Sequence, residues 1–405
     1  MASTKIQFPN ALGELLSAKL DVPVNQHPHT FAVFAHCFTC NKNLSAVRNI
    51  SRALNQAGIA VLRFDFTGLG ESEGEFADTN FTSNVEDLIA ACTFLAEQYQ
   101  APELIVGHSL GGAAVICAAD KVASIKAIAT IGAPFAPNHV SHLIATKAME
   151  IEAAGEAEVV IGGRAFKVKK QFLEDIIAQS LTEKLRKMRK AILVLHSPQD
   201  EIVEIENAAK LYHAAFHPKS FISLDGADHL LSDKADSNYT GTVIANWASR
   251  YITVSPKSML DSDKQVAVRL GEKGFTSEVM VRHHHLTADE PASVGGNDFG
   301  PTPYELVSAG LGACTAMTIQ MYARRKKWLV EEVVVHIDHK KDHAEDCEHC
   351  DETKNKIDVF DRTIELKGDL SEEQITRLME IADRCPVHRT LHEEVLVKTA
   401  LDDRS

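Results

Sequence analysis

The chain has 405 residues, of which 45% are hydrophobic and 24% charged, and its formal net charge is −14. Because a single hydrophobic core rarely grows beyond about 250–300 residues, this length predicts two domains. The negative charge argues against nucleic acid and anionic membranes as partners. No basic segment followed by an apolar run opens the chain, and no run of about 18 apolar residues follows. We therefore expect no secretory signal and no membrane span.

Eight cysteines occur in the chain. In a chain of this length without a visible export signal, they predict reduced thiols, some of them reactive, rather than a disulfide framework. The expected location is the cytoplasm.

From about residue 30 to 250, short apolar runs alternate with helical patterns. The runs predict strands at 30–38, 59–66, 103–109, 125–134, 191–200 and 220–229. Helical patterns lie at 83–100 and 204–216, among others. Nearly continuous apolar strands are typical of a parallel sheet covered on both faces, so this part is expected to be a doubly wound α/β domain. KIQFPN and LLSAKLDVP, in front of it, predict leading antiparallel strands.

Residues 136–189 interrupt this alternation and predict a lid inserted between two strands, with a hairpin turning at Gly162-Gly163. Near 250–263 the pattern dissolves into a polar segment, which we interpret as a linker. The expected domains are therefore 1–255 and 256–405.

The second part has an α+β pattern. Alternating runs predict strands at 265–271, 276–286, 331–341 and 357–369, and a final strand at 393–401. Residues 302–328 form one long helical stretch with a proline near its start. A second helix is predicted at 371–385, opened by a Ser-x-x-Gln capping sequence.

Gly107-His108-Ser109-Leu110-Gly111 follows a predicted strand and opens a predicted helix. In that context a GxSxG sequence places a serine on a sharp turn, where glycines let the neighbouring backbone pass. Asp200 and His229 follow, each at the end of an apolar run, in the order Ser, Asp, His. Taken alone, Asp200 is better explained as a turn residue and His229 as a helix-entry residue without a partner, but together with Ser109 they predict a catalytic triad. His229 would be the general base and Asp200 its orienting carboxylate.

An oxyanion produced by attack of Ser109 needs two backbone N–H donors. We expect one from Leu110 and one from Phe38, in the loop after the strand at 30–38. The stretches AHCFTCNKN, RFDFTGLGES and GHSLGG resemble small esterase- and acyl-peptidase-like α/β-hydrolases, over about residues 5–255. Such proteins usually carry glycine where this chain has Cys37 and Cys40. These two cysteines read either as small packing residues or as a redox gate on the hydrolase.

Residues 262–403 contain GPTPYELVSAGLGACTAMT and IADRCPVHRTL. With the proline-led helix and the late Cys-Pro, these sequences resemble the OsmC (osmotically inducible protein C) family. The resemblance implies a thiol peroxidase that reduces organic hydroperoxides, in which Cys314 attacks the peroxide and Cys385 resolves the sulfenic acid. An external thiol or dithiol would restore both cysteines. It also implies an intertwined homodimer formed through this domain.

In active members of that family, a glutamate directly after the helix-opening proline pairs with an arginine beside the thiolate. Here Tyr304 follows Pro303 and Glu305 comes one residue later, so Glu305 is the candidate supporting residue. Three arginines remain candidates for the activating cation: Arg282, Arg384 and Arg389.

The segment 336–352 gathers histidines with Cys347 and Cys350. The Cys-x-x-Cys spacing is compatible with zinc, but so polar a segment between two strands is more typical of a solvated loop. We expect no metal and no bound cofactor.

The sequence thus predicts a serine hydrolase acting on a small-molecule acyl substrate, joined to an OsmC-like peroxidase. Two alternatives stay open. One is an esterase on a catalytically silent dimerisation domain, and the other is a hydrolase whose rate responds to oxidants.

Overall fold

The computed structural model describes residues 2–23, 28–37, 40–137, 147–161, 164–254, 260, 262–272, 274–343 and 356–401. The chain divides into two compact units, Met1–His283 and His284–Ser405. This division falls later than the expected one at 255/256, since strands β11 (Val266–Leu270) and β12 (Ser277–Val281) count with the first unit.

An eight-stranded sheet forms the centre of the first unit, in the order β1-β2-β4-β3-β5-β6-β9-β10. Its strands are β1 (Ala2–Pro9), β2 (Leu15–Val22), β3 (Thr30–Ala35), β4 (Ile59–Phe64), β5 (Leu104–His108), β6 (Ala127–Ile131), β9 (Ala191–His196) and β10 (Lys219–Ser223). From β4 to β10 neighbouring strands are parallel, whereas β1 pairs antiparallel with β2 and β2 with β4. The doubly wound, mostly parallel sheet and its antiparallel leading strands are therefore confirmed.

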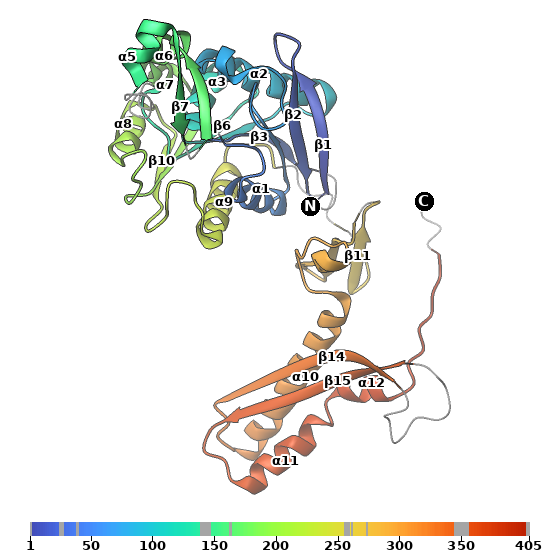
Figure 1. The fold of residues 1–405 in the computed structure, drawn as a ribbon. Helices are drawn as coiled ribbons and strands as arrows, with labels where there is room; N and C mark the ends of the chain where they lie inside the picture. The colour runs from blue at the N-terminus through green and yellow to red at the C-terminus, as the bar shows by residue number, and fades with distance from the viewer. Residues whose placement is uncertain are drawn as a thin grey trace. The chain divides into compact units, whose positions relative to one another are not determined.

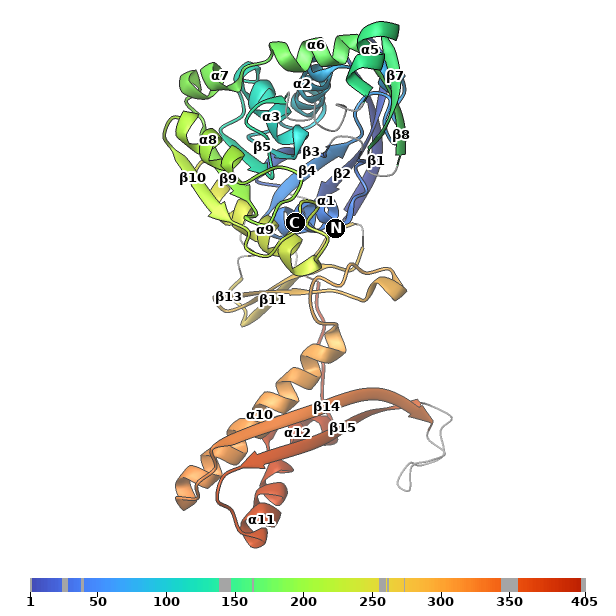
Figure 2. The same ribbon diagram turned by 60° about the vertical axis from the view of Figure 1, so that its left-hand side comes forward.

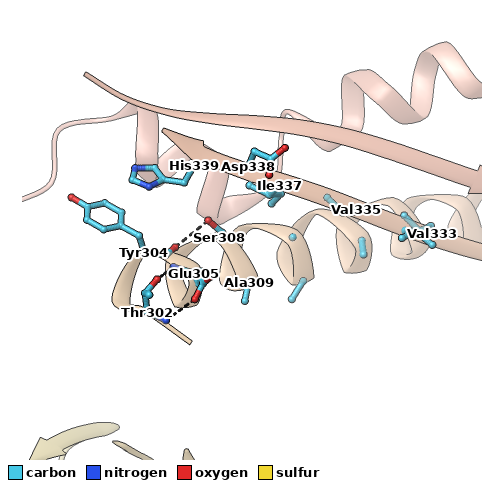
Figure 3. Close-up of a pocket in the computed structure, with 14 residues that line it drawn as sticks. Thr302, Tyr304, Glu305, Ser308, Ala309, Val333, Val335, Ile337, Asp338 and His339 are labelled. Atoms are coloured by element: carbon cyan, nitrogen blue, oxygen red, sulfur yellow. Dashed lines mark hydrogen bonds between the residues drawn. The ribbon is translucent and has the colours of Figure 1, made fainter. Parts of the chain in front are cut away.

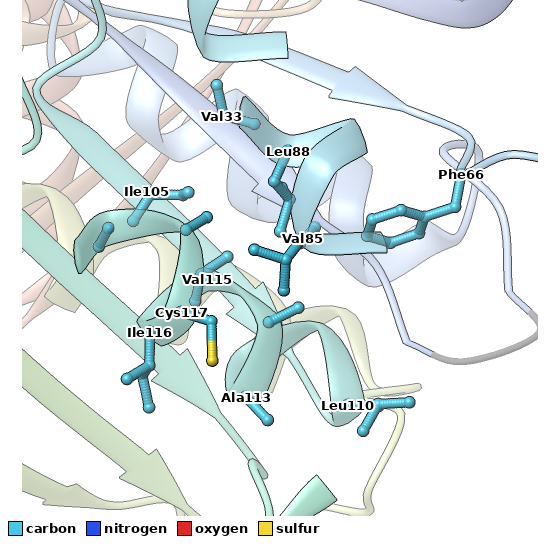
Figure 4. Packing of buried hydrophobic residues seen from close by; sticks show 14 of the residues in the cluster. Val33, Phe66, Val85, Leu88, Ile105, Leu110, Ala113, Val115, Ile116 and Cys117 are labelled. Atoms are coloured by element: carbon cyan, nitrogen blue, oxygen red, sulfur yellow. The ribbon is translucent and has the colours of Figure 1, made fainter. Parts of the chain in front are cut away.

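Successive side chains of the central strands enter two different cores, because strand side chains alternate between faces. Val33 belongs to one core and Phe34 to the other. Helices α1 (Ser45–Gln56) and α9 (Lys234–Ala248) cover one face of the sheet (Figures 1 and 2). The opposite face is covered by α2 (Phe81–Gln98), α3 (Leu110–Lys121) and α8 (Glu206–Ala214). Figure 4 shows Val85 and Leu88 of α2 close to Val115 of α3 in that core.

The predicted insertion lies between β6 and β9, two adjacent strands of the sheet. It contains α5 (Ala148–Ala154), the antiparallel hairpin of β7 (Glu156–Ile161) and β8 (Arg164–Lys169), α6 (Lys170–Ala178) and α7 (Leu181–Lys187). The pairing of β7 with β8 agrees with the predicted hairpin, although Gly162 and Gly163 themselves lie outside the described residues. Phe172 and Ile176 of α6 join the core above α2 and α3, so the insertion is fixed to the first unit by apolar packing.

The second unit is built around α10 (Pro303–Lys326). Its other elements are β13 (His284–Ala288), β14 (Glu332–His343), β15 (Lys356–Lys367), α11 (Glu372–Ala382) and α12 (Pro386–His392). β14 pairs antiparallel with β15, and α10 packs on β14, α11 and α12. Helix α10 has the length and apolar content of a membrane-crossing helix, and one face of it is buried in this unit, with Ile319 and Ala323 in a small core.

Two strand predictions after residue 255 were wrong. The expected strand at 276–286 is two strands, β12 and β13, because the chain turns at Arg282, whose φ is +55°. Residues 393–401 are extended but belong to no strand, since they pair with no described strand of this chain. Their apolar side chains are exposed, for example Leu396 at 78% and Val397 at 80%.

Candidate active sites

Ser109 lies on a tight turn between the last residue of β5 and the first residue of α3. Its φ of +56° belongs to the left-handed region, which a residue with a side chain adopts only when its surroundings hold it there. The Ser109 N–H donates to Ile131 O at 2.8 Å. A Cβ on Gly107 would lie 2.4 Å from Gly111 O, and one on Gly111 would lie 2.5 Å from His36 O. Both glycines are therefore required by close backbone contacts.

The structure brings Ser109, His229 and Asp200 into one hydrogen-bonded series. The Ser109 hydroxyl lies 3.0 Å from His229 Nε2, and His229 Nδ1 donates to Asp200 Oδ2 at 2.7 Å. The other oxygen of Asp200 accepts the N–H groups of Ile202 and Val203 at 2.9 and 2.8 Å. Burial raises the pKa of Asp200, but these hydrogen bonds outweigh it and the net shift is downward. Asp200 is therefore ionised near neutral pH, as a partner of an imidazolium must be.

Two further histidines, which the sequence analysis did not select, hold the loops of this series. His108 Nε2 donates to the backbone oxygen of His229 at 2.6 Å, and His196 Nε2 donates to Val203 O at 2.7 Å. Burial lowers the pKa of His108 to about 3, so its ring is neutral at working pH. The only signal in the sequence was the position of His108, directly before the serine.

The expected oxyanion hole lies between the start of α3 and the loop after β3. Leu110 is the first residue of α3, where amide groups have no partner within the helix. Phe38, the expected second donor, lies outside the described residues. The flanking Cys37 and Cys40 form a disulfide with a Cα–Cα distance of 5.4 Å. This corrects the expectation of reduced thiols at this pair, because the three-residue spacing brings the two Cα atoms within disulfide range.

A buried lysine, Lys42, anchors the same loop, and no pattern in the sequence predicted this role. The Lys42 N–H donates to Asp65 Oδ1 at 2.7 Å, and its fully buried ammonium contacts Asp65 Oδ2 at 2.5 Å. The ammonium also donates to Glu71 at 2.9 Å and to Ser17 Oγ at 3.0 Å. Its hydrogen bond to Glu71, with a second one from Lys5, lowers the pKa of Glu71 to about 2.

In the second unit Cys314 and Cys385 are both free thiols. Cys314 is partly exposed on α10, whereas Cys385 is fully buried at the residue before α12. The Cys385 sulfur accepts the N–H of His388 at 3.3 Å and lies 3.6 Å from Thr315 Oγ1. Thr315 follows Cys314 directly, so the structure brings Cys385 to the turn of helix that carries Cys314.

The arginine beside these cysteines is Arg362 of β15, not one of the three candidates from the sequence. Its Nη1 donates to Thr315 Oγ1 at 2.9 Å, and its Nη2 pairs with Asp383 at 2.6 Å. Its side chain is only 12% exposed. The sequence did contain a sign of this role. Arg362, Ile364 and Leu366 alternate along β15 and so lie on the same face of the strand. A charged side chain on an apolar face requires hydrogen-bond or ion-pair partners.

Comparison with known proteins finds one family for the part of the chain that carries Ser109 and another for the part that carries Cys314 and Cys385. Residues 26–173 match the serine aminopeptidase S33 family, and residues 295–400 match the OsmC-like protein family. The solved esterase domain of a Rhodothermus marinus protein is 52% identical, with a TM-score of 0.52, over 62% of this chain and 99% of that domain. The chain belongs to the α/β-hydrolases and carries an OsmC-like domain.

More distant relatives fit the hydrolase domain as well. Mouse palmitoyl-protein thioesterase ABHD10, a mitochondrial protein, is 24% identical over 232 residues, which cover 55% of this chain and 77% of that protein. The solved structure of mouse alpha/beta hydrolase domain-containing protein 10 is 21% identical over 61% of this chain and 99% of its own, with a TM-score of 0.52, and shares the fold. The hydrolase domain is thus similar to proteins named as an esterase domain and a thioesterase.

Glu305 does not lie beside the OsmC-like domain's cysteines within this chain. It closes the N-terminal capping box of α10, where its carboxylate accepts the N–H of Thr302 at 2.7 Å (Figure 3). Nine residues separate it from Cys314, which places it on the opposite face of the helix, about 13 Å away along the axis. Glu305 instead lines a cavity of about 750 Å³ where Tyr304 stacks on His339 with ring centroids 4.2 Å apart.

The remaining arginine candidates are placed elsewhere. Arg282 lies in the turn between β12 and β13, and Arg389 contacts Glu393 at 3.4 Å. The Arg384 N–H donates to Ile381 O at the end of α11. Cys347 and Cys350 lie outside the described residues, and the described part of the chain holds no group of three metal-binding side chains.

Proposed function

We propose that this chain is a bifunctional enzyme: a serine hydrolase of carboxylic esters or related acyl bonds, joined to a thiol peroxidase for organic hydroperoxides. The observation that carries the hydrolase half is the series Ser109–His229–Asp200, at 3.0 and 2.7 Å. In this proposal both halves act in the cytoplasm without a bound cofactor, and an external thiol or dithiol supplies electrons to the peroxidase.

The hydrolase reaction follows from the positions of three side chains. Ser109 Oγ attacks the acyl carbon while His229 Nε2 takes its proton, and the ionised Asp200 stabilises the imidazolium. The Leu110 N–H and a second donor, assigned here to Phe38, stabilise the oxyanion. His229 then protonates the leaving group, and water hydrolyses the acyl-enzyme with His229 again as base. The esterase and thioesterase relatives support ester and thioester bonds as the substrate class.

Steady-state hydrolysis tests this assignment, with para-nitrophenyl esters of graded acyl length as substrates. Ser109→Ala and His229→Ala should each lower kcat/KM by at least about a thousandfold, whereas His213→Ala, at an exposed histidine of α8, should leave it unchanged. If Ser109→Ala keeps wild-type activity on every active ester, the serine mechanism is wrong.

The peroxidase reaction uses the two cysteines of the OsmC-like domain. The Cys314 thiolate attacks the terminal oxygen of ROOH, the O–O bond breaks, and Cys314 becomes a sulfenic acid. The leaving RO− takes up a proton and becomes ROH. The Cys385 thiolate then attacks the Cys314 sulfur, forming the disulfide and releasing hydroxide, which takes up a proton as water. A dithiol reduces the disulfide and becomes a disulfide itself. The position of Cys385 beside Thr315 supports this second step.

Consumption of cumene hydroperoxide with dithiothreitol tests the peroxidase half. Cys314→Ser should abolish it, and Cys92→Ser, at a buried thiol of the hydrolase domain, should not. If the wild-type chain consumes no peroxide, the OsmC-like domain is a silent dimerisation module and the chain is a hydrolase alone.

A redox-controlled hydrolase is a second candidate, favoured by the Cys37–Cys40 disulfide. The disulfide flanks Phe38, the residue proposed as second oxyanion donor. In a reducing compartment such a bond responds to thiols rather than serving as a fixed crosslink. Reduction by a dithiol is then expected to change ester hydrolysis in the wild type but not in a Cys37→Ser/Cys40→Ser variant. Equal rates of the reduced and oxidised wild type would exclude this control.

We also propose a homodimer formed through the OsmC-like domain. Apolar side chains of α10 face solvent within a single chain, among them Met317 at 65% and Met321 at 71% exposure. The extended residues 393–401 add a further apolar, unpaired segment. Exposed apolar surface of this kind is typical of a protein interface.

A further inference from the structure

We infer that Thr315 and Arg362 form a device that activates Cys385, the second thiol of the proposed peroxidase, rather than Cys314, the first. The inference rests on the peroxidase proposal for its reaction, but its geometry stands on contacts within one chain. Thr315 Oγ1 lies 3.6 Å from the Cys385 sulfur, and Arg362 Nη1 donates to that same Oγ1 at 2.9 Å.

The direction of this contact depends on whether Cys385 is ionised. A threonine hydroxyl has one hydrogen to donate and two lone pairs to accept with. Arg362 occupies one lone pair, and the hydroxyl hydrogen has two acceptors in reach: Leu311 O at 2.8 Å and the Cys385 sulfur. When Cys385 is ionised, its sulfur is the stronger acceptor, so the hydrogen turns to it. The bound guanidinium polarises the O–H bond and strengthens this donation.

Burial makes this donation important for chemistry. Cys385 is fully buried, and Thr315 is fully buried beside it. An ion in an apolar setting is unstable unless hydrogen bonds and nearby charge compensate it. The thiolate of Cys385 receives the Thr315 hydroxyl, the His388 N–H at 3.3 Å and the nearby positive charge of Arg362. Thr315 touches the reacting sulfur and is therefore a catalytic residue, while Arg362 acts through it and is a positioning residue.

A cavity lies next to Arg362 and His388, two neighbours of Cys385. A cavity of about 690 Å³ is lined by Arg362, His388, Val307 and Leu311, among others. Cys314 continues the helical stripe of Val307 and Leu311, since residues four and seven apart share one face. The sulfenic acid formed on Cys314 would therefore face the wall that carries Arg362 and His388.

The test separates the two chemical steps in the full-length chain. One equivalent of cumene hydroperoxide is added to reduced protein, Cys314 sulfenic acid is trapped with dimedone, and closure of the Cys314–Cys385 disulfide is followed by peptide mass spectrometry. Thr315→Val should form the sulfenic acid at the wild-type rate but close the disulfide about ten- to a hundredfold more slowly, the range expected for losing a hydrogen bond to a charged group. Thr315→Ser should restore closure.

Matched variants distinguish this device from general packing. Thr318→Val removes the next threonine hydroxyl of α10, a half-buried group that donates to the Cys314 backbone oxygen, and should leave closure unchanged. Arg362→Met should slow disulfide closure, and Arg362→Lys should recover part of the rate. Asp383→Asn should leave the rate unchanged, because the hydrogen bond from Arg362 Nη1 to Thr315 stays in place. Wild-type closure in Thr315→Val, or an equal slowing of sulfenic acid formation, would overturn the inference.

A peroxide-independent measurement separates failure of this inference from failure of the peroxidase proposal. The rate at which iodoacetamide modifies Cys385 near neutral pH should fall in Thr315→Val and in Arg362→Met, whether or not the chain consumes peroxide. If modification is slower in both variants but the wild-type chain consumes no peroxide, the peroxidase proposal is wrong and the activated thiol stands. Unchanged modification rates in both variants would reject the activated thiol itself.

Discussion

Single residues of the hydrolase domain show which parts of a site are readable from sequence. Ser109, Asp200 and His229 were predicted because each follows an apolar run read as a strand, and the carboxyl ends of parallel strands meet at one edge of the sheet. Arg362 and Lys42 were not, because their roles depend on partners from strands and loops far away in the chain. Sequence periodicity predicts which face of a helix or strand a residue occupies. It does not predict which residue, distant in the chain, will pair with a buried charge.

A buried carboxyl of α2 gives a prediction about pH and stability. Burial raises the pKa of Asp87 to about 6, although its carboxylate accepts the N–H and hydroxyl of Thr67. The folded state therefore binds this proton more tightly than the unfolded state, whose aspartate has a pKa of about 3.9. Its contribution to the free energy of unfolding is complete below about pH 4 and is lost as pH rises through about 6. The loss amounts to about 3 kcal/mol.

Urea unfolding of the full chain at about pH 4 and about pH 7 measures this contribution. Compared with the wild type, Asp87→Asn should have a higher unfolding free energy at about pH 7 relative to its value at about pH 4, because the amide does not titrate. Asp225→Asn, at an exposed carboxyl, is the control and should preserve the wild-type difference. An Asp87→Asn profile parallel to that of the wild type would contradict the assignment.

At the scale of elements, the contact between α3 and β3 fixes the hydrolase site. Helix α3 begins so close to β3 that Gly111 faces the backbone oxygens of Ala35 and His36. The same strand end leads into the loop that carries the disulfide and Lys42. Strands and helices of this domain were predicted well because apolar runs and helical periodicity alternate clearly. The strand prediction at 393–401 was wrong, because these residues have the pattern of a strand but pair with no strand in the described part of the chain.

Gly111→Ala tests this contact. In a helix alanine is more favourable than glycine by about 1 kcal/mol, so any loss must come from the new Cβ, which would lie 2.5 Å from His36 O. We expect a net loss of about 1–3 kcal/mol of unfolding free energy and strongly reduced ester hydrolysis. Gly310→Ala in α10, where no atom lies within 4 Å of the new Cβ, should be neutral or stabilising. Urea unfolding gives the stability of both variants, and ester hydrolysis gives their activity. Wild-type stability and activity in Gly111→Ala would show that α3 can shift to make room for the new Cβ.

At the scale of the whole molecule, the OsmC-like domain buries little of its apolar surface within one chain. Its described core holds four buried residues, Ile319, Ala323, Leu378 and Ala382, whereas the hydrolase domain has two extensive cores. A core this small rarely stabilises a domain by itself. A second copy that covers α10 and pairs with residues 393–401 would supply the missing burial, since an extended segment gains main-chain hydrogen bonds at a sheet edge.

Leu396→Asp tests this association, because a charge on the extended segment cannot be buried at an apolar interface without a large cost. Light scattering after size exclusion should report a dimer for the wild type and a mass about half as large for the variant at the same concentration. Met149→Asp, at an equally exposed residue of α5 in the hydrolase domain, should keep the dimer mass. Ester hydrolysis should survive in both variants, because Ser109, His229 and Asp200 come from one chain. If the Leu396→Asp variant stays dimeric, residues 393–401 do not form the interface. If the wild type is monomeric, the proposed dimer is wrong and the apolar face of α10 is exposed to solvent in the folded protein.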